Sequence, residues 1–587
     1  MIELLKTLGA QIKEFKKDSV LTPIFMILEV ILETLIPLMM ASIIDNGVTA
    51  GDMNHIIKMG LLMILTAAVS LYAGVMGGKY GARASAGFAR NLREAMFEKI
   101  QTYSFSNIDK YSTAGLITRL TTDVSNIQNA YQMILRMFTR APASLIFAMT
   151  MAFFINSRLA LIYLGAVIFL AIILAFALKR VTKYFSSVFK KYDDLNASVQ
   201  ENVSGIRVVK AYVREDFEKS KFKKASENVY KLFVKAENIT ILASPIMQIT
   251  VYTCILLISW LGAKFIVADN MTTGELMSLL TYCMNILMSL MMLSMIFVMA
   301  SMSFAGAKRI AEILNEEPAI KNPENPDFDI KDGSVEFKNV CFSYNTSETA
   351  DPVLSDVSFK INSGETVGII GGTGSSKTTL VSLISRLYDA TGGEVLVAGK
   401  NVKEYDIEQL RNEVSVVLQK NVLFSGTILE NLRWGDENAT LDDCRRVCRA
   451  ACADEFIDKM PDGYDTHIEQ GGTNVSGGQR QRLCIARALL KKPKIIIFDD
   501  STSAVDTATE AKIRVSLQEN IPDTTKIIIA QRISSVRHAD KIIVLDNGRI
   551  DGIGTHDELV ASNEIYREVF ESQTGAGGDF DENGGDE

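Results

Sequence analysis

The hydrophobic pattern divides the 587-residue chain into two unlike parts. The first ~320 residues hold long apolar runs, whereas the rest alternates short strands and helices as soluble α/β domains do. Six apolar runs approach or exceed the ~20 residues that cross a bilayer. They lie at 20–44, 56–78, 141–156, 159–178, 241–266 and 276–300. The third is short, and we expect it to start earlier, across 133–140. The pattern predicts an all-α six-helix transmembrane domain followed by an α/β domain.

Charge placement predicts the orientation of the spans. Lys and Arg are abundant after the second and fourth spans, and nearly missing from the connections 45–55, 156–158 and 267–275. Positive-inside reasoning then puts both termini in the cytoplasm of a multi-pass cell-membrane protein. The two long basic segments keep helical periodicity, so we expect them to continue as helices into the cytoplasm. Residues 1–18 are basic and amphipathic without a signal-peptide cleavage site, which favours an interfacial helix.

Two carboxylates, Glu29 and Glu33, lie one helical turn apart within the first span. Because an ionisable pair at membrane depth is costly, it indicates either a cationic substrate or, the reading we favour, an interhelical contact or a water-filled cavity. The sixth span carries a methionine cluster that suits a permissive cavity but is also ordinary filler. Its members are Met284, Met288, Met291, Met292, Met295 and Met299.

A glycine-rich stretch follows the apolar run 366–370 and precedes a helix-compatible run from Leu380. It reads Gly371-Gly372-Thr373-Gly374-Ser375-Ser376-Lys377-Thr378-Thr379. Glycines let backbone N–H groups surround phosphate oxygens, and the helix N-terminus adds a favourable dipole. Lys377 would reach the outer phosphates, and the Thr378 hydroxyl would ligate Mg2+. A second apolar strand that ends in Asp499, a carboxylate suited to Mg2+, decides against an ordinary strand–helix turn.

Further motifs lie before and after the phosphate loop and Asp499. They are Tyr344, Gln419, Ser476-Gly477-Gly478-Gln479 and Ser503-Ala504-Val505-Asp506. Their order and approximate spacing resemble the ATP-binding cassette (ABC) transporters over residues 333–570. The resemblance implies an exporter-type architecture whose P-loop domain binds ATP and Mg2+. It also implies short coupling helices near Ser106–Thr113 and Ala211–Lys219, the second docking on a partner chain.

The resemblance implies a role for each matched residue. Tyr344 would stack on adenine, residues 371–379 would hold the phosphates, and Asp506 would line the nucleotide site. Thr378, Asp499 and Gln419 would hold Mg2+, and Gln419 would also contact the attacking water. Ser476, Gly477, Gly478 and Gln479 would cap the γ-phosphate of an ATP bound by the other subunit. Two cassettes must therefore face each other, and this chain contains one.

The chain also departs from the family pattern at the catalytic positions. Asp500 stands where hydrolysing members have a glutamate, and Gln531 stands where they have a switch histidine. His538 lies seven residues later and does not fill that position. Ser376 replaces a glycine, which costs on the order of 1 kcal/mol if the site needs a positive φ. We expect ATP to bind here but to be hydrolysed poorly.

This division between an impaired site and an intact signature resembles heterodimeric, multidrug-type ABC exporters with one degenerate and one consensus site, and the resemblance implies one half of such an exporter, which would move an amphipathic drug, lipid or peptide. Its ATPase activity would reside mainly at the partner's consensus site. Alternatives are a homodimer that hydrolyses slowly at both sites, an importer with the exporter fold, and an ATP-gated channel or regulatory subunit. The net charge of −8 gives no support to nucleic-acid binding.

Composition sets the remaining boundaries. We expect a transmembrane domain over 1–318, a Pro-rich linker over 319–333, the nucleotide-binding domain over 334–572 and a disordered acidic tail over 573–587.

The chain has seven cysteines, and none lies in a predicted outside loop, so we expect no disulfides. Cys444, Cys448 and Cys452 share a helical face, but without a fourth ligand nearby they read as small buried hydrophobes rather than a metal site.

Overall fold

The computed structural model describes residues 2–344, 352–500 and 506–574. Contacts divide the chain into two units. The helical unit comprises residues 1–102 and 112–316, and the nucleotide-binding unit comprises residues 103–111 and 317–587. The predicted tail from 575 onward lies outside the described residues, while residues 573 and 574 end the last helix.

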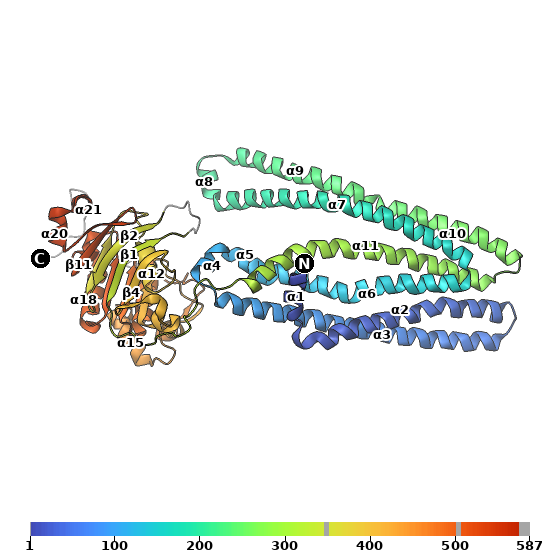
Figure 1. The fold of residues 1–587 in the computed structure, drawn as a ribbon, viewed down its shortest axis with the longest axis horizontal. Coiled ribbons are helices and arrows are strands. Elements are labelled where there is room, and N and C mark those ends of the chain that lie inside the picture. The colour runs from blue at the N-terminus through green and yellow to red at the C-terminus, as the bar shows by residue number, and fades with distance from the viewer. Residues whose placement is uncertain (1, 345–351, 501–505, 575–587) are drawn as a thin grey trace. The chain divides into compact units, whose positions relative to one another are not determined.

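The helical unit is built from ten α-helices among its described residues (Figure 1). They are α1 (Ile2–Ala10), α2 (Lys16–Ser42), α3 (Met53–Gln101), α5 (Thr113–Thr118), α6 (Val124–Ile155), α7 (Ser157–Ser204), α8 (Ile206–Ala211), α9 (Glu215–Ile241), α10 (Ala243–Val267) and α11 (Thr273–Asn315). Within the part of the chain that the structure describes, six segments are long and apolar enough to cross a membrane, which agrees with the predicted number of spans. The third span does start earlier, because α6 is helical from Val124.

The basic segments after the second and fourth spans continue as helix, as predicted. α3 and α7 have 49 and 48 residues, about 70 Å each at the 1.5 Å rise of an α-helix. This length is more than twice the hydrocarbon core of a bilayer. The short helix that follows α7 is Ile206–Ala211, earlier than the predicted 211–219. Gly205 ends α7, and Val213 adopts a positive φ of 52° before α9 begins.

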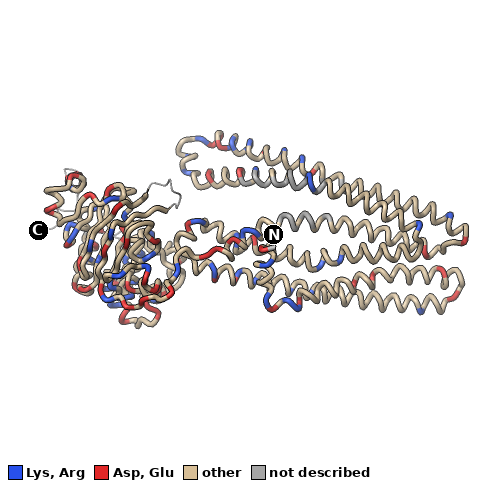
Figure 2. Tube along the Cα trace, viewed as in Figure 1, with Lys and Arg blue, Asp and Glu red and all other residues tan. Residues whose placement is uncertain are grey.

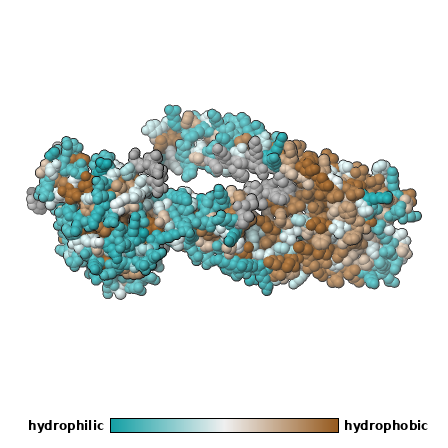
Figure 3. Space-filling view, in the orientation of Figure 1, coloured by the Kyte–Doolittle hydropathy of each residue, from teal (hydrophilic) through white to brown (hydrophobic). Residues whose placement is uncertain are grey.

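Hydrophobic side chains cover the spanning part of the helical unit. In Figure 2 charged residues follow α9 along most of its length and lie on the part of α7 nearer α8, whereas α10 and the part of α7 farthest from α8 are almost uncharged. Figure 3 shows a continuous hydrophobic surface over that uncharged part. Exposed apolar side chains in such number have a favourable environment only in lipid. The hydrophobic surface therefore marks the part within the membrane.

An ion cluster joins α2 to α6 inside the spans. Nη1 of Arg140 donates to Oε1 of Glu29 at 2.8 Å, and Nη2 donates to both carboxylate oxygens of Glu33 at 2.9 Å. A Cβ at Gly74 of α3 would lie 2.9 Å from Oε1 of Glu29, so the glycine makes room for this carboxylate. Of the two interpretations of the glutamate pair, the structure shows the interhelical contact.

The topology makes a prediction that labelling can check. Cysteines introduced at Ala50 and Asn270, both exposed in connections between spans, should react with an impermeant maleimide on intact cells. Ser562→Cys, also exposed, should react only after permeabilisation because the nucleotide-binding unit is cytoplasmic. The wild-type chain gives the background from its own cysteines. Labelling of position 562 in intact cells would contradict this orientation.

The nucleotide-binding unit is built on a six-stranded, mostly parallel sheet and a smaller antiparallel sheet. The first has the order β12-β11-β3-β10-β9-β6 and the second β2-β1-β4-β5, beside a two-stranded β7-β8 pair. The strands are β1 (Val335–Phe342), β2 (Leu354–Ile361), β3 (Thr366–Ile370), β4 (Gly392–Val397), β5 (Lys400–Asn401), β6 (Val414–Val417), β7 (Gly426–Thr427), β8 (His467–Ile468), β9 (Ile495–Asp499), β10 (Thr525–Ile529), β11 (Lys541–Asp546) and β12 (Arg549–Gly554). The parallel strands are continuous apolar runs because both faces are covered.

Helices cover this sheet and form a second, helical core. They are α12 (Lys377–Ile384), α13 (Ile407–Glu413), α14 (Ile428–Leu432), α15 (Leu441–Ala450), α16 (Asp454–Ile457), α17 (Gly477–Leu490), α18 (Thr507–Asn520), α19 (Ile533–Val536), α20 (His556–Ser562) and α21 (Glu564–Thr574). Cys444, Cys448 and Cys452 are buried in the same apolar cluster as Leu483 and Ile485 of α17. Their burial among apolar side chains agrees with their prediction as small hydrophobes.

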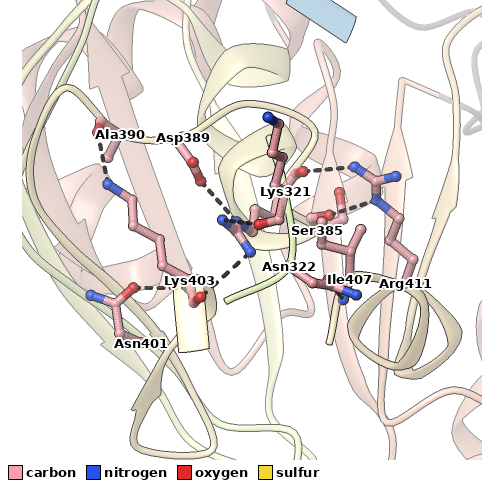
Figure 4. Close-up of polar contacts among 10 residues, drawn as sticks. Lys321, Asn322, Ser385, Asp389, Ala390, Asn401, Lys403, Ile407 and Arg411 are labelled. Carbon is pink, nitrogen blue, oxygen red and sulfur yellow. Dashed lines mark hydrogen bonds and ion pairs between the residues drawn. The ribbon is translucent and has the colours of Figure 1, made fainter. Parts of the chain in front are cut away.

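The predicted linker, 319–333, lies against the nucleotide-binding unit. Ile330 is buried in the core of that unit. Asn322 accepts from the backbone N–H of Ile407 at 2.8 Å, and the carbonyl of Lys321 accepts from the buried Arg386 at 3.2 Å (Figure 4). α4 (Phe105–Lys110) belongs to the same unit, where Asp109 accepts a hydrogen bond from Tyr388.

Candidate nucleotide site

The phosphate loop connects β3 to α12 as the sequence predicts. β3 is central in the parallel sheet, so the loop leaves at its carboxyl edge, where such sheets bind ligands. A Cβ at Gly371 would lie 2.2 Å from the carbonyl oxygen of Leu545, and Gly374 has a φ of +86°. Only glycine fits the first position, and the second favours glycine. The loop is therefore held close to the neighbouring strand.

The side chain of Lys377 folds back onto the phosphate loop. Its Nζ donates to the carbonyls of Gly371 and Gly372 at 2.8 Å and to Oγ of Ser375 at 3.2 Å. Burial lowers the pKa of Lys377, while the nearby carboxylates Asp500 and Asp499 oppose this shift. Phosphate oxygens would supply the negative charge that the half-buried ammonium needs. The residues present therefore fit a nucleoside triphosphate.

The two predicted Mg2+ ligands lie together. Oγ1 of Thr378 donates to Oδ1 of Asp499 at 3.0 Å, although the residues are 121 positions apart. Asp499 is 2% exposed, and this burial raises the pKa of its carboxyl. A hydroxyl and a carboxylate are hard oxygen donors of the kind that Mg2+ takes beside phosphates. Mg2+ bound there would neutralise charge on the phosphates, and this pair would hold it.

Tyr344 and Gln419 lie at the margins of the site. The hydroxyl of Tyr344 is 2.9 Å from Oγ1 of Thr379, and the residue is 54% exposed, so an adenine could stack on its ring. Gln419 is exposed two residues after β6, which pairs in parallel with β9. It therefore emerges at the same edge of the sheet as Asp499.

The two residues at which the sequence departs from the family's catalytic pattern contact each other. Nε2 of Gln531 donates to Oδ2 of Asp500 at 2.9 Å. β9 and β10 are parallel neighbours, so the residues that follow them meet at the edge of the sheet. Asp500 has a positive φ of 46° and its N–H donates to the carbonyl of Ile529 at 3.1 Å. His538 instead lines a separate cavity with Lys526 and Glu510, so it does not replace the switch histidine.

The signature residues lie on another element. Ser476 is the N-cap of α17, where its hydroxyl accepts from the N–H of Gln479 at 3.2 Å and its own N–H donates to the Gln479 side chain at 2.9 Å. Gly477 and Gly478 form the first turn of α17. Asp506 likewise caps α18, and hydrogen bonds from Thr509 lower the pKa of its carboxyl. Ser503, Ala504 and Val505 lie outside the described residues.

One contact at this site had no signal in the sequence. Gln573 of α21 donates to the carbonyl of Gln531 at 2.9 Å and accepts from the N–H of Ile533 at 2.9 Å. α21, the last described helix, therefore holds the segment from Gln531 to Ile533 in place. A polar residue near the end of a chain carries no pattern that marks such a contact, so only the fold shows it.

Ser376 adopts the strained conformation that its replacement of glycine predicts. It has φ 73° and ψ 23° at the start of α12. We expect Ser376→Gly to raise the free energy of unfolding of this unit by about 0.5–1 kcal/mol, because strain is relieved while glycine adds entropy to the unfolded chain. Denaturant unfolding measures it. Ser385→Gly, at a φ of −85° at the other end of the helix, should destabilise instead. Equal effects of the two substitutions would contradict the strain argument.

Comparison with known proteins places this site in a family. Residues 20–291 match the family model of the ABC transporter transmembrane region, and residues 354–503 match the family model described as ABC transporter. The chain is 36% identical over 555 residues to YfiB of Bacillus subtilis, an uncharacterized ABC transporter ATP-binding protein, covering 94% of this chain and 96% of that protein. An uncharacterized Mycobacterium tuberculosis relative is 36% identical over 576 residues, covering 97% and 98%.

A solved structure shares the whole fold. A bacterial Atm1-family ABC exporter with ATP bound superposes with a TM-score of 0.82 at 24% identity, over 96% of this chain and all of that one. The chain therefore belongs to the ABC transporters and has the exporter-type fold. It is a membrane-spanning transporter with a cytoplasmic ATP-binding domain.

Proposed function

We propose that this chain is one half of a heterodimeric ABC exporter that moves an amphipathic drug, lipid or peptide outward. Its own phosphate loop binds ATP and Mg2+ but supports little hydrolysis. Its signature, Ser476–Gln479, completes the partner's site, where most ATP is hydrolysed.

The hydrogen bond between Gln531 and Asp500 carries this proposal. An aspartate is one methylene, roughly 1.5 Å, shorter than the glutamate that usually positions the attacking water, and misplacing such a group is costly. The side-chain amide of Gln531 donates to Asp500. It therefore replaces neither the imidazole of the usual switch histidine nor the contact of that imidazole with the γ-phosphate. Since general-base assistance is worth typically ~10²–10⁴-fold, the loss of both groups leaves a slow site.

The signature supports the other half of the proposal. Ser476 and the glycines that follow begin the 14-residue helix α17, and Ser476 is exposed. A helix N-terminus with an exposed hydroxyl and backbone N–H groups suits the γ-phosphate of an ATP brought by another chain. A partner that carries the usual glutamate and histidine would find a complete signature here. The heterodimer would then have one complete ATP site and one impaired ATP site.

Exposed apolar residues support a two-chain unit. Tyr212 and Val213, which follow α8, are 75% and 80% exposed. The nucleotide-binding unit exposes a stacked pair, Phe424 and Trp434, with ring centroids 4.1 Å apart. Both lie outside the spans, so water would surround them in a single chain. Each would be covered if the α8 turn of one chain docks on this patch of the other.

ATPase assays with the chain alone, and with a second half-transporter co-expressed, test the proposal. We expect little activity alone and substrate-stimulated activity together. The partner's glutamate changed to glutamine should abolish turnover and transport, whereas Asp500→Asn here should reduce them far less. Vigorous stimulated ATPase from this chain alone would favour a homodimer. Nucleotide-dependent flux without turnover would favour a channel, and uptake in right-side-out vesicles would favour an importer.

A further inference from the structure

A small cavity in the nucleotide-binding unit lies between α18 and the parallel sheet. It has a volume of about 40 Å³, and its lining includes Phe498 and Lys526 from the sheet and Glu510 and Arg514 from α18. Ser535 of α19 also lines it. Among the described residues, the lining includes none from the phosphate loop, so the cavity is distinct from the nucleotide site. Its volume has room for about three waters, or for one small polyatomic ion.

Two buried charged side chains line this cavity without pairing with each other. Lys526 is 4% exposed, and the one described acceptor of its Nζ is the neutral carbonyl of Thr524, at 2.9 Å. Burial lowers the pKa of Lys526, and Asp540 and Asp523, which lie outside the lining, oppose this shift. Glu510 is 9% exposed, and its carboxylate forms no hydrogen bond or ion pair with any residue that the structure describes. Because buried charges are costly without a partner, a ligand in the cavity would stabilise both side chains.

The charges of the lining favour a monoanion. Arg514 lies one helical turn after Glu510 on α18, and its guanidinium forms no hydrogen bond or ion pair within the described parts of the chain. Burial lowers the pKa of His538, which also lines the cavity, and Arg514 and Arg537 lower it further, so this imidazole is neutral above neutral pH. Two cations and one carboxylate remain, a net charge of +1. A bound monoanion would therefore neutralise the site.

The hydrogen-bonding groups set a second requirement. The ammonium of Lys526 and the guanidinium of Arg514 can only donate, so the ligand must carry acceptors for them. The carboxylate of Glu510 can only accept, so the ligand must also carry a donor. Ser535, which is 7% exposed, has a hydroxyl that can do either. A small oxyanion that keeps one hydroxyl group meets both requirements.

We propose that this cavity binds bicarbonate, a planar monoanion with one hydroxyl group. Its two unprotonated oxygens accept from Lys526 and Arg514, and its hydroxyl donates to Glu510. Nitrate has the same shape and charge but no hydroxyl, so one of its oxygens would face the carboxylate of Glu510 without a proton between them. Two such acceptors repel each other, and both stay unsatisfied. The site therefore distinguishes the two ions.

Isothermal titration calorimetry of the purified full-length protein tests this site. The protein is saturated with Mg2+ and a non-hydrolysable ATP analogue, so that the phosphate loop is filled, and is titrated with sodium bicarbonate or sodium nitrate at mildly alkaline pH. We expect one bicarbonate to bind per chain, and nitrate to bind at least about tenfold more weakly because a site built for a hydroxyl rejects an analogue without one. Absence of bicarbonate binding, or equal affinity for the two ions, would contradict the proposal.

Three variants make the outcome specific. Lys526→Met keeps the apolar stem without the ammonium and should lose bicarbonate binding. Glu510→Gln offers an amide that can accept from bicarbonate and donate to nitrate, so its affinities for the two ions should become similar. Lys512→Met, at an exposed position of α18, should bind as the wild type does. Wild-type binding by Lys526→Met would place the ion elsewhere and overturn the proposal. An unchanged preference in Glu510→Gln would also overturn it, even if Lys526→Met does not fold.

Discussion

Replacing Asp500 by glutamate and Gln531 by histidine in the same chain should raise ATP turnover at this chain's own site by ~10²–10⁴-fold. The longer carboxylate reaches the attacking water, and the imidazole replaces an amide that now bonds to Asp500. The left-handed φ of 46° at position 500 suits aspartate better than glutamate, so a small loss of thermal stability should accompany the gain. The measurement is steady-state ATPase of the complex with the partner's glutamate disabled.

Matched variants separate this effect from general changes. Asp523→Glu adds the same methylene to an exposed aspartate elsewhere in the unit and should leave turnover unchanged. Asp500→Glu alone should give less than the pair, because Gln531 would still lack the imidazole contact. If the wild-type site already turns over as fast as the double variant, the proposal of an impaired site is wrong.

Removing the cation from the intramembrane cluster should destabilise the helical unit strongly. Arg140→Met keeps a long helix-forming side chain but leaves Glu29 and Glu33 without their shared partner. Breaking a buried ion pair by removing one member typically costs about 3–5 kcal/mol, because a charge remains uncompensated. Glu33 is 43% exposed at its side chain, so we expect the lower end of that range. Thermal unfolding of the purified protein measures the loss.

Neutralising the acids should reverse that loss. Glu29→Gln and Glu33→Gln combined with Arg140→Met remove all three charges, and most of the stability should return. Arg158→Met, at the exposed start of α7, removes a cation outside the cluster and should change stability by less than about 0.5 kcal/mol. A stable Arg140→Met protein with an unchanged unfolding midpoint would show that the cluster has no structural role.

Much of the architecture could be predicted from local pattern. Apolar runs of membrane length marked the six spans because a bilayer imposes one length on every helix that crosses it. Glycines 371 and 374 marked the phosphate loop because backbone close approach and positive φ need them there. The strained Ser376 followed from the same requirement. Each of these depends on neighbours in sequence.

The bounds of α8, the second of the two predicted short cytoplasmic helices, could not be predicted from local pattern. Residues around 206–219 mix apolar and charged side chains, so several helical turns fit them equally well. The break at Gly205 and the left-handed turn at Val213 place the helix at Ile206–Ala211. The exact start and end of a short helix depend on caps and packing more than on periodicity.

Contacts between distant residues depended on the tertiary structure. The register of β9 against β10 brings Gln531 to Asp500, and helix rotation brings Arg140 to Glu29 and Glu33. Sequence by itself determined the spans and their orientation, and it predicted residues for ATP binding, because bilayer thickness and phosphate geometry act on short segments. Only the fold decided which charged and polar side chains meet, because strand register and helix rotation are set by packing over the whole chain.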